Sequence, residues 1–227
     1  KLTEGTSDLS NGLSDAGDKL SMVSTKEDNA KTLADPLTLS KTDENRVEKN
    51  GIGMAPYMIS VALFVAAIST NIIFSTLPSG QEPKTKQDWL KARIGVNGVI
   101  SVVAGILVYG AVHLIGLSAN HELATLGLIV LASMTFMALV TALVTWDSKL
   151  GAFASLILLL LQLASSAGTY PLELTSKIFQ VINPWLPMSY SVSGLRQTIS
   201  MNGQIGSQVF FLAFVLVLFM ALGTLVY

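Results

Sequence analysis

The sequence predicts an all-α membrane protein, a polytopic helix bundle with about five spans. After residue 50, long apolar runs follow one another, each long enough to cross a hydrocarbon layer about 30 Å thick as a helix. Hydrophobic residues make up 51% of the chain and charged residues only 13%, about half the charged share of soluble domains. A soluble core explains one such run, but not several in succession. The predicted spans are residues 54–77, 94–117, 123–146, 150–168 and 209–227.

A change of character at residues 51–53 divides the chain into two parts. Residues 1–50 are polar and hold seven Lys/Arg and ten Asp/Glu, which leaves seven basic and five acidic residues for 51–227. We therefore expect the end of a stalk and a connector over 1–50, and a transmembrane domain over 51–227. Because the chain begins at Lys1 and is still apolar at Tyr227, we expect a piece of a longer protein.

The first twenty residues carry a seven-residue repeat. This spacing keeps one seam of a helix facing a partner helix, as a coiled stalk requires. Only about two heptads are present, so a solvated linker explains the same residues equally well. The repeat consists of Leu2, Gly5, Leu9, Gly12, Leu13 and Leu20.

Basic residues predict the orientation of the spans in a cell membrane. The loops 78–93 and 146–150 contain five Lys/Arg, whereas the loops 118–122 and 169–207 contain two. Basic residues near span ends prefer the cytoplasm, and long flanking domains are not counted. We therefore expect the first pair of loops to be cytoplasmic and residues 1–50 to be extracytoplasmic.

Four polar residues stand out within the predicted spans: Asn71, Asn97, His113 and Gln162. Asn97 and Gln162 are predicted to form hydrogen bonds between helices, worth about 0.6–2 kcal/mol each. For His113, near the outer end of its span, a neutral ring bonded to a neighbouring helix is favoured over a proton relay. No acidic residue lies in the middle of a span, which argues against a carrier coupled to protons or sodium ions.

Motifs for catalysis, metals, cofactors and nucleic acids are missing from the sequence. It has no phosphate-binding glycine loop, no His-Glu-x-x-His and no Gly-x-Ser-x-Gly, and it contains no cysteine. His121 and Glu122 form an isolated pair in a short loop, where a surface cap is favoured over a metal site. We expect no enzyme activity, no cofactor and no nucleic-acid partner.

Residues 170–200 predict a re-entrant or interface-lying hairpin before the last span. Leu174, Ile178, Val181, Ile182 and Trp185 fall on one face of a helix over 172–182, too short to span. The segment is bounded and broken by Pro171, Pro184 and Pro187, and Trp185 and Tyr190 suit the headgroup level. Arg196, on a short helix of the hairpin, is left with three alternatives: Glu173, a lipid phosphate or no partner.

Several of these motifs resemble known membrane proteins. The order Gly-Thr-x-Pro (168–171), amphipathic helix, Asn-Pro-x-x-Pro-x-x-Tyr (183–190) and Gly-Leu-Arg (194–196) is similar to the membrane domain of type-2 ABC exporters. The Leu-x-x-Gly repeats, the junction Asn-Gly-Ile-Gly-Met-Ala-Pro-Tyr-Met (50–58) and Trp-Leu-Lys-Ala-Arg (89–93) resemble the C-terminal region of the phage infection protein (YhgE/Pip) family of Gram-positive bacteria.

The resemblance implies two classes of function. In the first, the bundle anchors a cell-surface protein that acts as a phage receptor or as a scaffold for the envelope or for type VII secretion. In the second, it is an ABC-2-like permease subunit that exports a hydrophobic or envelope substrate and is driven by a separate ATPase. The ATPase would dock at Trp89, Leu90, Lys91 and Arg93, unless these basic residues only hold the topology. Few polar residues are present to line a transport pathway, and this scarcity favours the anchor.

The partners implied are the lipid bilayer, a second copy in a homodimer, and a separate ATPase or secretion-machinery proteins. A phage particle would bind through an ectodomain outside this sequence.

Overall fold

The computed structural model describes residues 2–21, 50–74, 83–168 and 171–227. Contacts divide the chain into two units, Lys1–Glu44 and Asn45–Tyr227. Most of the connector predicted between stalk and first span lies outside the described residues.

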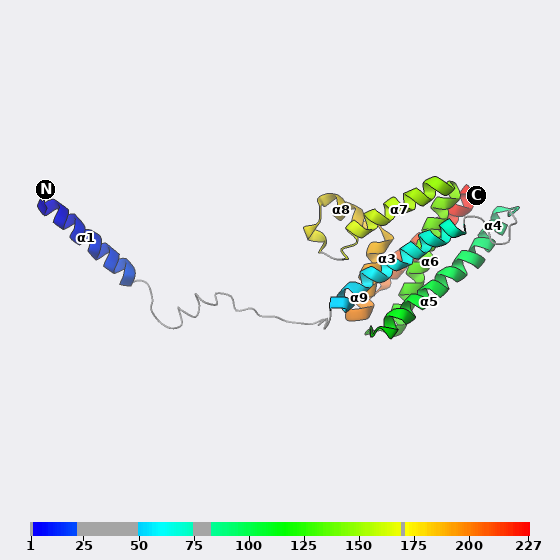
Figure 1. Cartoon of the computed structure of the whole chain (residues 1–227), viewed down its shortest axis with the longest axis horizontal. Coiled ribbons are helices and arrows are strands. Elements are labelled where there is room, and N and C mark those ends of the chain that lie inside the picture. The colour runs from blue at the N-terminus through cyan, green and yellow to red at the C-terminus, as the bar shows by residue number, and fades with distance from the viewer. Residues whose placement is uncertain (1, 22–49, 75–82, 169–170) are drawn as a thin grey trace. The chain divides into compact units, whose positions relative to one another are not determined.

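In the first unit, α1 (Leu2–Ser21) is a helix of 20 residues, drawn in blue in Figure 1. Leu9, Leu13 and Leu20 of the predicted seam are exposed along it. The Lys19 Nζ atom lies 2.8 Å from Asp15 Oδ2, an (i, i+4) pair that stabilises an exposed helix by a few tenths of a kcal/mol. The predicted helix is therefore present, and its pairing with a partner helix stays a prediction.

The second unit is an all-α bundle, and its described residues contain no strand. Five of its helical stretches are long and apolar enough to cross a membrane: Asn50–Ile73, Lys86–Leu114, Glu122–Trp146, Ser148–Ser165 and Gly206–Val226. The elements in chain order are α3 (Asn50–Ile73), α4 (Lys86–Arg93), the π-helical η1 (Ile94–Gly98), α5 (Val99–Leu114), α6 (Glu122–Trp146), α7 (Ser148–Ser165), the 3₁₀ turn η2 (Leu172–Leu174), α8 (Lys177–Ile182), the 3₁₀ turn η3 (Asn183–Trp185), α9 (Pro187–Ser200) and α10 (Gly206–Val226).

Each of the five spans agrees in place with a predicted one, but the second differs at its start. The predicted span begins at residue 94, whereas α4 continues through η1 into α5 as one helical stretch that begins at Lys86. Ile94 keeps right-handed helical angles at the junction (φ −63°, ψ −43°), and no proline or other break intervenes. At the start of α4, the Thr85 hydroxyl accepts a bond from the Asp88 amide and caps the helix.

α6 is the central helix of the bundle, because α3, α5, α7, α9 and α10 all pack against it. Figure 1 shows α6 running beside α3 and α5. Phe64 of α3 meets Phe136 of α6 edge to face, with ring centroids 5.2 Å apart and planes inclined by 60°. Met188 and Leu195 of α9 and Leu212 of α10 are fully buried in the same core.

The hairpin before the last span has two arms of different character. The helix predicted over 172–182 is interrupted, because Thr175 and Ser176 adopt extended angles and the Thr175 hydroxyl donates to the Leu172 carbonyl oxygen at 2.6 Å. The second arm, α9, starts at Pro187, as proline favours at a first helical position. It packs between α3, α6 and α10, and nine of its 14 residues are buried.

Close packing of α7 on α6 makes Gly151 sensitive to substitution. A Cβ atom at this position would lie 2.0 Å from the Leu143 carbonyl oxygen. Gly151→Ala is expected to destabilise the bundle by about 1–3 kcal/mol, because backbone must move to relieve the overlap. Thermal unfolding of the full-length protein in mild detergent measures this change.

Gly127→Ala in α6 is the matched control, since nothing lies within 4 Å of its Cβ position. It is expected to leave stability unchanged or to raise it by up to about 1 kcal/mol. Equal losses in both variants would contradict the packing of α7 on α6.

Candidate functional site

Two of the predicted intramembrane polar residues form one buried cluster with a third that the sequence did not single out. The Asn97 Nδ2 atom donates to Thr141 Oγ1 at 2.9 Å, and the Thr141 hydroxyl donates to Asn71 Oδ1 at 3.0 Å. The Asn71 Nδ2 atom donates to the Ala67 carbonyl oxygen at 2.9 Å. This polar cluster, Asn71, Asn97 and Thr141, joins α3, η1 and α6, as interhelical amides do in membranes. A threonine in an apolar helix carries no sequence signal of such a role.

A groove of about 650 Å³ opens beside the polar cluster. One wall is α4, η1 and the start of α5, the second is α10, and α6 lies between them. The π-helical turn at Asn97 contributes to the first wall; such turns in α-helices are frequently found at functional sites. Most lining residues are apolar, and the exceptions are Arg93, Asn97, Ser101, Thr141 and Thr224. This groove is the candidate binding site of the bundle.

The predicted docking residues on α4 lie largely against the bundle. Trp89 is only 3% exposed; its ring stacks on Tyr227, with centroids 5.5 Å apart. Arg93 is also buried, and its Nη1 atom donates to the Phe74 carbonyl oxygen at 3.3 Å. Leu90 is partly buried, and Lys91 is exposed. Of the four, only the Lys91 side chain is thus openly presented to a partner, and docking of an ATPase stays a prediction.

Polar side chains tie the hairpin to α7. The Met188 amide donates to Gln162 Oε1 at 3.2 Å, and the Asn183 side-chain amide donates to the Ser165 carbonyl oxygen. The Arg196 Nη2 atom donates to the carbonyl oxygens of Ala167 and Gly168, at 2.6 and 3.0 Å.

These bonds give Arg196 a partner outside the three predicted alternatives, the C-terminal end of α7. Ala167 there has φ +53°, a left-handed conformation that costs energy for a residue with a side chain. Burial lowers the pKa of the Arg196 guanidinium, which nevertheless stays protonated because its usual pKa is so high. The cation therefore lies where the helix dipole favours positive charge.

The first arm of the hairpin presents an apolar surface. Leu174, Ile178, Val181 and Trp185 are between 66% and 78% exposed, as the predicted face requires, whereas Ile182 is partly buried. Figure 1 shows α8 at the end of α7 and α4 at the opposite end of the bundle.

The hairpin prolines and Tyr190 shape its turns. Pro171 precedes η2, Pro184 lies in η3 and Pro187 opens α9. The Tyr190 hydroxyl donates to the Pro184 carbonyl oxygen at 3.0 Å, and its ring stacks on Phe211.

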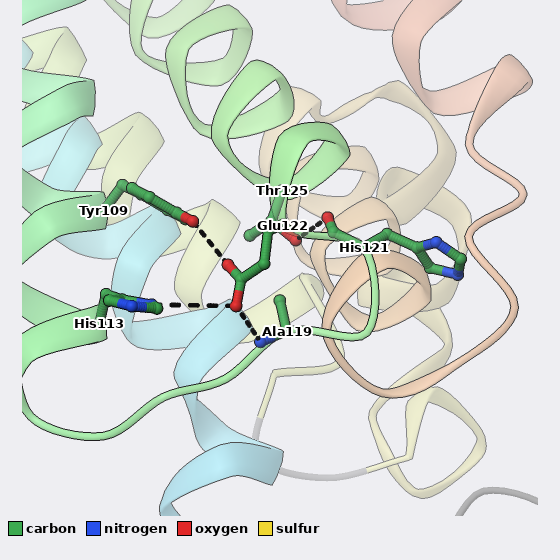
Figure 2. Close-up of polar contacts among 6 residues, drawn as sticks. All are labelled: Tyr109, His113, Ala119, His121, Glu122 and Thr125. Carbon is green, nitrogen blue, oxygen red and sulfur yellow. Dashed lines mark hydrogen bonds and ion pairs between the residues drawn. The ribbon is translucent and has the colours of Figure 1, made fainter.

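His113 belongs to a cluster around Glu122 at the α5–α6 loop (Figure 2). The Tyr109 hydroxyl donates to Glu122 Oε2 at 2.5 Å, and the Ala119 amide donates to Oε1 at 3.0 Å. The His113 Nδ1 atom lies 3.8 Å from Oε1, so the predicted bond to a neighbouring helix is a loose contact. His121 points away from Glu122 in Figure 2. The sequence signal for this cluster was the spacing of Tyr109 and His113, one helical turn apart.

The described residues contain no group of three or more His, Cys, Asp or Glu that could hold a metal ion. In the described part, polar side chains form hydrogen bonds between helices. The groove beside α6 is mostly apolar. The expectation that the protein is not an enzyme stays a prediction.

Comparison with curated proteins shows a relative of part of this sequence. The chain is 32% identical over 174 residues to the uncharacterized protein YhgE of Bacillus subtilis (strain 168). The match covers 76% of this chain and 22% of YhgE, so the chain spans about a fifth of that relative's length. No family model matches the chain, and no solved structure matches it. This similarity agrees with the resemblance to the YhgE/Pip family drawn from the sequence.

Removing the Thr141 hydroxyl tests the polar cluster. Thr141→Val leaves the Asn97 amide and Asn71 Oδ1 without this partner, so a loss of about 1–2 kcal/mol is expected in thermal unfolding. Thr145→Val is the control, because that hydroxyl donates only to the Thr141 carbonyl oxygen of its own helix. A Thr141 variant as stable as its control would show that the cluster does not hold the helices together.

Glu122→Ala tests the loop cluster. The Ala119 amide then loses a bond to a charged acceptor, and its hydrogen exchange is expected to become about tenfold faster. Tyr109→Phe, which keeps that bond, is expected to leave Ala119 nearly unchanged. Unaltered exchange in Glu122→Ala would contradict the geometry in Figure 2.

Proposed function

We propose that residues 50–227 form the membrane anchor of a bacterial cell-surface protein, a phage receptor or a scaffold for envelope or type VII secretion. The stalk helix α1 would belong to the extracytoplasmic part that this bundle holds. The similarity to YhgE supports a membrane protein of this kind, and the particular role is our proposal.

The proposal rests on the hydrogen-bond partners of the polar side chains in the bundle. Asn71, Asn97 and Thr141 bond to one another, and Gln162 accepts from the Met188 amide. The Ser60 and Ser191 hydroxyls lie 2.7 Å apart between α3 and α9. A transport path for a polar substrate needs such groups turned toward water, whereas here they join helices.

The acidic residues of the described bundle support the same proposal. Asp88 and Glu122 lie in the first turns of spanning helices, Asp147 lies between α6 and α7, and Glu173 lies in η2. A carrier coupled to ions usually places a carboxylate at the middle of a span. The described carboxylates instead suit helix ends and loops.

A second candidate is the ABC-2-like permease subunit, driven by a separate ATPase. It is favoured by the buried arm α9 directly ahead of the last span, the arrangement that the resemblance to type-2 exporters implies. Its substrate would be hydrophobic, since the groove between α5 and α10 is mostly apolar.

An affinity pull-down of the full-length protein from mild detergent separates the two functions. The anchor predicts that envelope or secretion proteins are recovered without an ATPase. The permease predicts a stoichiometric ATPase that is lost in Lys91→Glu. This variant is preferable to a change at Trp89, because Lys91 is exposed and Trp89 is buried in the bundle.

Lys149→Glu is the control for charge alone, since Lys149 is exposed in the first turn of α7, within the segment 146–150 predicted to lie on the same side of the membrane. A stoichiometric ATPase that survives Lys149→Glu and is lost in Lys91→Glu would overturn the anchor proposal.

A further inference from the structure

The helix α1 has an exposed apolar seam along one side. Leu9, Leu13 and Leu20 are 64%, 65% and 72% exposed, and Ala16, which lies between the last two, is exposed as well. These four residues follow one another at intervals of four, three and four, the alternation of d and a positions in a coiled coil. The seam therefore has the spacing that packs against another helix of the same kind.

Within one copy, α1 has little else to stabilise it. Gly5, Gly12 and Gly17 each weaken an exposed helix, because glycine loses more backbone freedom on folding than alanine does. The ion pair between Lys19 and Asp15 is exposed and offsets little of this loss. Most of the stability of a helix in a protein comes from packing of its apolar face. We therefore expect α1 to depend on burial of its seam.

The charges of α1 lie away from this seam. Asp8, Asp15 and Asp18 fall at c and f positions, on the opposite side of the helix. The e and g positions, where charges normally select one partner over another, hold three glycines, one serine and Lys19 between residues 5 and 19. Two identical helices can thus join their seams without bringing their carboxylates together, and no charge pattern selects a different helix.

The bundle brings copies of α1 close together. After Ser21 the chain runs on to α3, the first of five helical stretches long and apolar enough to cross a membrane. Copies in one membrane share one orientation, so their α1 helices enter the bundle from the same end. Tethering of this kind raises the effective concentration of one helix around another, which favours even a short seam.

We propose that α1 pairs with α1 of a second copy as a parallel, in-register coiled coil. Leu9, Leu13, Ala16 and Leu20 each face the same residue of the partner, and the carboxylates of the helix point outward. The inference goes beyond the proposed function, which leaves the number of copies open, and it holds for an anchor and for a permease alike.

Disulfide cross-linking of the full-length protein in membrane vesicles tests this pairing, after any cysteines elsewhere in the protein have been replaced. Leu9→Cys, Leu13→Cys and Leu20→Cys each place a thiol in the seam. Asn11→Cys and Asp18→Cys are the matched controls, because both residues are exposed at f positions of the same helix. The seam variants are expected to form linked dimers roughly tenfold faster than the controls, since a disulfide requires Cβ atoms about 4 Å apart.

Leu20→Cys also reports the direction of the pairing. In an antiparallel pair with full overlap, Leu20 would face the partner's Leu2, and the two copies of Leu20 would lie about 27 Å apart. Rapid dimer formation by Leu20→Cys is therefore expected from a parallel pair alone.

A charge in the seam gives the second arm of the test. Leu13→Asp, added to the Leu20→Cys protein, brings two carboxylates face to face and is expected to slow dimer formation about tenfold. Asn11→Asp adds the same charge on the opposite side of α1 and is expected to leave the rate unchanged.

Three results would overturn the proposal. One is a lack of linked dimers in all three seam variants, which would make a helix of another kind the partner of α1. Another is an equal rate in the seam variants and their controls, which would mean random collision. The third is rapid linking at Leu9→Cys and Leu13→Cys without linking at Leu20→Cys, which would indicate an antiparallel pair.

Discussion

The bundle depends on hydroxyl groups of α6 that donate to three neighbouring helices. The Ser133 hydroxyl reaches the Ser101 carbonyl oxygen of α5 at 2.8 Å, and the Thr135 hydroxyl reaches the Leu212 carbonyl oxygen of α10 at 3.1 Å. Thr141 donates to Asn71 of α3. In a bilayer, apolar side chains gain little by leaving lipid for one another, so close packing and such bonds hold helices together. Anchoring, the hairpin and the groove all rest on the position of α6.

The hairpin is fixed at both of its ends by backbone capping. Arg196 holds the last carbonyl oxygens beyond α7, and the amides of Asn120 and His121 donate to the carbonyl oxygens of Ile199 and Thr198 at the end of α9, both at 3.0 Å. Unpaired carbonyl groups at a helix end are costly in a buried place. α9 is therefore held as part of the bundle, while α8 keeps its apolar side chains exposed beside it.

Much of the fold could be predicted from the sequence because hydrocarbon demands long apolar helices. The interruption at Thr175 could not, since the apolar spacing of Leu174 and Ile178 is the same with or without a break. The partners of Asn71 and Asn97 were likewise out of reach, because Thr141 lies in another helix and resembles any other threonine. The backbone partners of Arg196 leave no pattern in a sequence, and the burial of Trp89 depends on its stacking on Tyr227, which is distant in the sequence.

The polar cluster of Asn71, Asn97 and Thr141 is used between helices, and we infer that it is closed to water. Cysteine labelling measures this directly in the full-length protein freed of other cysteines. Thr141→Cys is placed in the polar cluster and Ser118→Cys in the exposed α5–α6 loop, and each is treated with a membrane-impermeant thiol reagent from either side of the membrane. We expect labelling at Ser118→Cys from one side and none at Thr141→Cys from either. Labelling at Thr141→Cys would reveal a water path through the bundle and would contradict it.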